Sequence, residues 1–119
     1  MFGSPEDSGE LARTYGVLHR LGLSANYRGF YQMAWAVQLA RREPGRLLLV
    51  TKCIYPDVAR HCRTSQMAVE RNLRTAGKVI WEARTPLLRE VVGEGSGARP
   101  CTARLLAMIA AYLSREDAA

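Results

Sequence analysis

Residues 66–82 carry two stripes of opposite character, and this arrangement limits the possible folds more than any other feature of the sequence. The apolar stripe consists of Val69, Leu73, Ala76 and Ile80. The opposite stripe repeats the same steps with Met67, Arg71, Arg74 and Lys78. Steps of four, three and four residues are the period of an α-helix. The segment therefore predicts a helix with one buried face and one basic, exposed face.

A second helix is predicted directly before this one, starting at Pro56. Proline suits the first helical position because its missing N–H would be unpaired there. Asp57 adds a negative charge near the positive end of the helix dipole. Thr64 or Ser65 can cap the following helix by accepting a backbone N–H. The stretch therefore predicts a helix-turn-helix whose second helix spans about residues 65–82.

The exposed face of the second helix has the side chains that read DNA in the major groove. Arginine can donate two hydrogen bonds to guanine, glutamine can pair with adenine, and glutamate can accept from cytosine. The predicted base-reading residues are Gln66, Glu70 and Arg71. The predicted contacts to phosphates or to the groove are Arg63, Thr64, Ser65, Met67, Arg74 and Lys78. The alternative interpretation is a solvated basic face on an ordinary bundle helix.

The composition agrees with a small globular domain that has an anionic partner. The chain has 119 residues, 48% of them hydrophobic, which suits a single domain with a core and argues against disorder. Seventeen basic and eleven acidic side chains give a net charge of +6, which suits a polyanion without requiring one. No apolar run approaches the ~20 residues needed to cross a bilayer. The longest run, Leu47–Val50, is expected in the core.

The rest of the chain predicts an all-α bundle of about six helices. Residues 1–9 are expected to be a flexible tail, and residues 10–119 a single helix-turn-helix domain. The other predicted helices are 10–21, 28–42, 46–54, 86–92 and 100–115, with a flexible loop at 93–99. Residues 46–54 also fit a strand by period alone. We favour a short buried helix, because a single strand would have no partner.

The cysteines and histidines do not predict a metal site or a catalytic site. Cys53, His61 and Cys62 match no zinc-finger spacing. No group stands out that would orient a Cys/His nucleophile pair. We therefore expect neither enzyme activity nor a cofactor. An odd number of cysteines and no secretory segment favour a cytoplasmic protein with free thiols.

Three short motifs carry a resemblance to a known family. They are YPD at residues 55–57, VER at residues 69–71 followed by Arg74, and AMIA at residues 107–110. Together they resemble the DNA-binding effector domain of the stage-zero sporulation response regulator family. The resemblance extends from about Leu18 to Leu113.

The resemblance implies six helices and recognition of a short promoter box in the major groove. It also implies paired domains, as a homodimer on tandem boxes, and contact with an RNA polymerase sigma factor. Glu70 and Arg71 match positions that read bases in the family, and Arg74 matches as well. Family members usually carry a phosphoacceptor receiver domain ahead of this module. Since few residues precede the match, we expect no receiver domain in this chain.

Two departures from the family pattern motivate a second hypothesis. Ala68 stands where the family has a basic side chain, and Gly77 stands where it has a branched apolar one. Glycine also weakens a helix by about 1 kcal/mol relative to alanine. The alternative function is therefore a protein-interaction module that no longer reads DNA and that pairs with a full-length response regulator to modulate it.

Overall fold

The computed structural model describes residues 5–94 and 97–118, and every regular element within them is helical. The α-helices are α1 (Pro5–Arg20), α2 (Gly29–Arg42), α3 (Val50–Cys53), α4 (Tyr55–His61), α5 (Gln66–Ala83), α6 (Pro86–Val92) and α7 (Thr102–Ala118). A 3-10 helix, η1, spans Pro44–Leu49. The all-α fold predicted from the sequence is confirmed.

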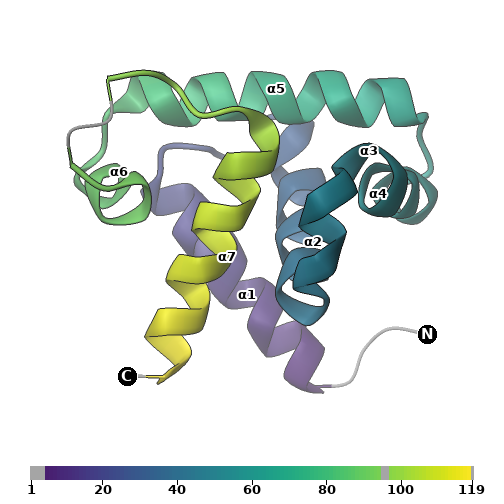
Figure 1. Ribbon diagram of the computed structural model, residues 1–119, viewed down its shortest axis with the longest axis horizontal. Coiled ribbons are helices and arrows are strands. Elements are labelled where there is room, and N and C mark those ends of the chain that lie inside the picture. The colour runs from purple at the N-terminus through teal and green to yellow at the C-terminus, as the bar shows by residue number, and fades with distance from the viewer. Residues whose placement is uncertain (1–4, 95–96, 119) are drawn as a thin grey trace.

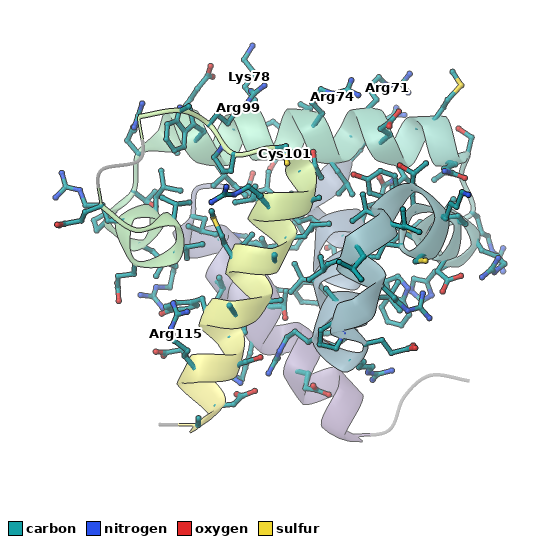
Figure 2. The ribbon with its side chains drawn as sticks, viewed as in Figure 1. Arg71, Arg74, Lys78, Arg99, Cys101 and Arg115 are labelled. Atoms are coloured by element: carbon teal, nitrogen blue, oxygen red, sulfur yellow. The ribbon has the colours of Figure 1, made fainter. Side chains whose placement is uncertain are left out.

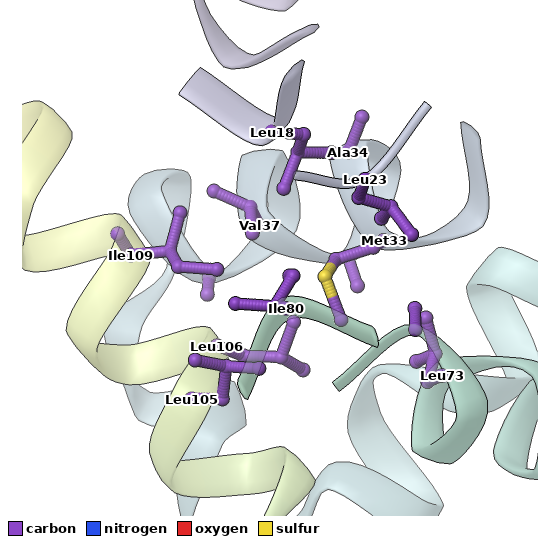
Figure 3. Close-up of a cluster of buried hydrophobic side chains, with 14 of the residues drawn as sticks. Leu18, Leu23, Met33, Ala34, Val37, Leu73, Ile80, Leu105, Leu106 and Ile109 are labelled. Carbon is purple, nitrogen blue, oxygen red and sulfur yellow. The ribbon is translucent and has the colours of Figure 1, made fainter. Parts of the chain in front are cut away.

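Helix α5 lies across one side of the molecule, and α1, α2 and α7 extend away beneath it (Figure 1). The core fills the space where these four helices converge. Figure 3 shows apolar side chains from all four meeting there: Leu18 of α1, Met33 and Val37 of α2, Leu73 and Ile80 of α5, and Leu106 and Ile109 of α7. Since the core lies on one side of α5, the opposite side of that helix is left exposed.

A close approach between α2 and α5 fixes the position of α5 on this body. A Cβ atom at Gly29 would lie only 2.5 Å from the backbone oxygen of Asn72, so a larger residue would force the helices apart. Asn72 also donates a hydrogen bond of 3.2 Å to the side-chain oxygen of Gln32. The start of α2 is therefore held against the middle of α5.

The helix boundaries differ from the prediction at both ends of the chain. Helix α1 begins at Pro5, so residues 5–9 of the predicted tail are helical, whereas residues 1–4 lie outside the described part. Proline at the first helical position explains this start. The last helix begins at Thr102 rather than at Pro100. The predicted loop at residues 93–99 is non-helical where it is described, and residues 95 and 96 lie outside that part.

The segment from Arg46 to Ile54 is helical, as predicted, but it is not a buried helix. Residues 44–53 form η1 followed by the short α3, and neither contains a buried residue, whereas Ile54 directly after α3 is fully buried. Leu48 is 85% exposed and Leu49 57% exposed, so the expectation that the whole apolar run lies in the core was wrong. Leu47 and Val50 are half-buried and pack against the core, whereas Leu48 and Leu49 between them face outward.

No described helix has both the length and the apolar character required to cross a membrane.

Candidate nucleic-acid interface

A tight turn joins α4 to α5. The Thr64 N–H donates to the Ala59 carbonyl at 2.9 Å, and the Arg63 N–H donates to the Arg60 carbonyl at 3.4 Å. These two bonds form a Schellman motif, in which the residue after the C-cap adopts the left-handed conformation. Arg63 is that residue, with a φ of 54°. The chain therefore reverses within a few residues, which confirms the predicted helix-turn-helix.

Ser65 caps the N-terminus of α5. Its backbone is extended, and its hydroxyl oxygen accepts a hydrogen bond of 3.0 Å from the Ala68 N–H. This is the capping geometry expected for Thr64 or Ser65, and the structure assigns it to Ser65. Thr64 contributes its backbone N–H to the preceding turn instead.

Helix α4 is held in place by an ionic network that includes the segment before it. Asp57 accepts a hydrogen bond of 2.5 Å from Arg46 of η1 and another from Arg60. Arg46 also donates to the Cys53 carbonyl at 2.5 Å and pairs with Glu43. The hydrogen bond from Arg46 is the main reason why the pKa of the Asp57 carboxyl is lowered. The network orients α4, on which α5 rests.

Helix α5 separates its two predicted stripes as expected. Val69, Leu73, Ala76 and Ile80 are buried. Figure 2 shows Arg71, Arg74 and Lys78 projecting from the opposite side of the helix, away from the body of the protein. Within residues 5–94 and 97–118, Arg71 and Lys78 form no ion pair, and Arg74 lies 3.9 Å from Glu70. Acidic side chains in the described part of the chain therefore neutralise these positive charges only weakly.

The residues predicted to contact DNA lie together along the turn and the free face of α5. The exposed ones are Arg63, Ser65, Gln66, Met67, Glu70, Arg71, Arg74 and Lys78, whereas Thr64 is half-buried. Gln66 differs from the others because its amide nitrogen donates to the Thr51 carbonyl of α3 at 2.7 Å. One of the two N–H donors of this amide is therefore engaged, and the pairing expected of Gln66 with adenine would use the other N–H and the side-chain oxygen.

Sequence reasoning did not include Arg99, which precedes α7. Figure 2 shows Arg99 on the same side of the molecule as Arg71, Arg74 and Lys78, with Arg115 at the opposite end. Arg99 and Arg74 line one hollow of 240 Å³. No local pattern could have revealed this proximity, because 25 positions separate the two residues along the chain. Only the packing of α7 against α5 brings them together.

The two departures from the family that the chain resembles lie at the edges of the exposed face of α5. Ala68 is half-buried on the first turn of α5. Gly77 is buried, and a Cβ atom there would lie 3.4 Å from a methyl carbon of Leu105 in α7. Neither position interferes with the exposure of Arg71, Arg74 or Lys78.

The cysteines are free thiols in the described part of the chain. Cys53 and Cys62 are half-buried, whereas Cys101 is exposed. Burial raises the pKa of the Cys62 thiol, so this sulfur is a poor nucleophile. The described residues contain no group of three or more His, Cys, Asp or Glu side chains arranged to hold a metal ion.

Comparison with known families gives a match over most of the chain. The family described as "Sporulation initiation factor Spo0A C terminal" matches residues 14–113. The match begins inside α1 and ends inside α7, so it includes the whole helix-turn-helix and the segment that carries Arg99.

Proposed function

Since this chain belongs to the sporulation initiation factor Spo0A C-terminal family, a family of DNA-binding regulatory domains, we propose that it is a sequence-specific transcription regulator whose helix α5 reads the major groove. The observation that carries the proposal is the exposed cationic face of α5, which the Schellman turn and the core present outward. The major groove of B-DNA, about 12 Å wide, admits one α-helix.

The residues of this face divide into two proposed roles. Glu70 and Arg71 lie side by side on the exposed surface and present an acceptor and a bidentate donor to base edges. Arg63, Arg74 and Lys78 supply positive charge to phosphates, which sets affinity without selecting a sequence. The proposed contacts to the wall of the groove also include Thr64, Ser65 and Met67, which lie at or just before the N-terminal end of α5.

Two matched substitutions test these roles. Arg71→Ala is expected to lower the free energy of binding to a family-type promoter box by about 1–3 kcal/mol and to reduce the preference for that box over a scrambled duplex. Lys78→Ala is expected to weaken binding to both duplexes alike. Fluorescence anisotropy titrations with both duplexes measure the two losses. Equal losses for both variants on both duplexes would contradict the assigned roles.

The alternative, a module that pairs with a full-length regulator and no longer reads DNA, makes the opposite prediction. Ala68 and Gly77 motivated it, but both leave the projecting cations in place. This alternative requires the absence of a gel shift on a family-type box at near-physiological salt. A clear shift that decreases steeply with salt supports DNA binding, because each neutralised phosphate releases counterions.

Three further expectations stay predictions, two of them from the resemblance and the third from the cysteine count and the lack of a secretory segment. They are binding as a homodimer on tandem boxes, contact with an RNA polymerase sigma factor, and a cytoplasmic location. A duplex with two boxes, compared with a duplex with one, measures the first of these as a gain in apparent affinity.

A further inference from the structure

A hollow of 240 Å³ lies between α5 and the segment that leads into α7. Arg74 and Gly77 of α5 line one side, and residues 99–102 with Leu105 line the other. The hollow has room for several waters, since one water takes about 30 Å³ of liquid volume. It adjoins the face of α5 that is proposed to enter the groove (Figure 2).

The walls of this hollow are held by groups on three helices. Tyr55, at the start of α4, is 4% exposed, and Thr102 at the start of α7 lies close enough to affect the pKa of its hydroxyl. Gly77 has no side chain, so α5 leaves the space beside Leu105 open. A branched side chain at residue 77 would extend into that space. The lack of a side chain at Gly77 therefore contributes to the hollow.

The charges that line the hollow have the same sign. Arg74 approaches Glu70 only to 3.9 Å, which is longer than a hydrogen bond, and its side chain is 62% exposed. Arg99 is exposed and forms no ion pair with a residue in the described ranges. Two guanidinium groups that line one hollow repel each other unless an anion lies between them. Guanidinium groups bind phosphate through paired N–H donors.

We propose that this hollow, lined by Arg74 and Arg99, is a seat for one backbone phosphate of the DNA strand that borders the major groove. The inference rests on the proposed function and deepens it. Arg71 lies on the free face of α5, and Arg74 lies one turn further along the helix, toward α7. A phosphate between Arg74 and Arg99 would fix the depth and the register of α5 in the groove.

Arg99→Ala tests the seat, with Arg115→Ala as the matched control because Arg115 lies at the far end of the molecule (Figure 2). Arg99→Ala is expected to lower affinity about tenfold on both the box and a scrambled duplex, the lower end for a charged hydrogen bond. It should also reduce the slope of log affinity against log salt by about 0.9, the value for one phosphate contact. Arg115→Ala should change neither quantity.

A scan with single methylphosphonates locates the phosphate. One neutralised position in the box should weaken the wild-type protein more than it weakens Arg99→Ala, in which only Arg74 still contacts that phosphate. If no such position exists, or if Arg99→Ala binds like Arg115→Ala, the seat is refuted while the proposed function stands. A wild-type protein that binds no duplex refutes both.

Filling the hollow without changing any charge provides a second test. Gly77→Val is expected to weaken binding to both duplexes, whereas Gly77→Ala, which adds one methyl group at an ordinary contact distance from Leu105, should bind like the wild type. Thermal unfolding checks that both variants are folded. If Gly77→Val is folded and binds like the wild type, the hollow does not hold a phosphate.

Discussion

Helix α5 and the segment of residues 44–53 are both helical and both rich in apolar residues, yet they pack in opposite ways. The apolar residues of α5 are spaced three and four apart, and all four residues of its predicted apolar stripe are buried. The apolar residues of the other segment are consecutive, and none is fully buried. Spacing, rather than apolar content, therefore decides burial, because consecutive residues of a helix point in different directions.

The two segments are also held by different forces. The apolar stripe of α5 is held by the core, in which Leu73 and Ile80 are completely enclosed. The segment of residues 44–53 is held by Arg46, which joins Glu43, the Cys53 carbonyl and Asp57, as well as by the half-buried Leu47 and Val50. Removal of apolar volume should therefore damage α5, and removal of charge should damage the attachment of residues 44–53.

The largest effect is expected for Leu73→Ala. This substitution should lower the free energy of unfolding by about 2–5 kcal/mol, since it removes an enclosed side chain and leaves a cavity. Urea unfolding followed by far-UV circular dichroism measures the loss. A cost below 1 kcal/mol would show that the core does not hold α5 in the way that its burial indicates.

An intermediate effect is expected for Asp57→Asn, which removes the charge that Arg46 and Arg60 share. The loss should be on the order of 1 kcal/mol at pH 7. The pKa of Asp57 is lowered in the folded protein. Its contribution is therefore present above the unfolded pKa of about 3.9 and decreases as the pH falls through the folded pKa.

Urea titrations of the wild type and Asp57→Asn between pH 7 and pH 2 measure this contribution. The difference between the two proteins should be constant down to about pH 5 and should shrink below about pH 4. A difference that grows as the pH falls would contradict the lowered pKa.

The smallest effect is expected for Leu48→Ala, the same chemical change as Leu73→Ala in the other segment. Leu48 is 85% exposed, so its truncation should change the free energy of unfolding by less than about 0.5 kcal/mol. The same urea experiment gives the comparison directly. If Leu48→Ala costs as much as Leu73→Ala, then exposure does not separate the two segments.

Much of the fold could be predicted because its signals are local. The apolar stripe of α5, the cap at Ser65 and the start of α4 each depend on residues within one or two helical turns. The prediction failed at Leu48 and Leu49 because a run of four apolar residues does not specify whether the chain forms a 3-10 turn. The start of α1 at Pro5 was missed because a polar composition was interpreted as a tail.

The candidate site divides in the same way. The cations of α5 were predicted because they share one helical face, whereas Arg99 was missed because its proximity to Arg74 depends on α7. Gln66 was predicted from its chemistry alone. Its hydrogen bond to Thr51 joins α5 to α3, and no periodicity within α5 could indicate it.

The sequence by itself determined which residues form the helices around the turn and which face of α5 is charged. Both properties follow from side-chain spacing and from backbone groups within a few residues of one another. Only the tertiary structure decided that Arg46 binds Asp57 of α4. It alone also decided that the segment before α7 places Arg99 near Arg74 of α5. These contacts join residues far apart in the chain, and their geometry exists only when the shared core has brought the helices together.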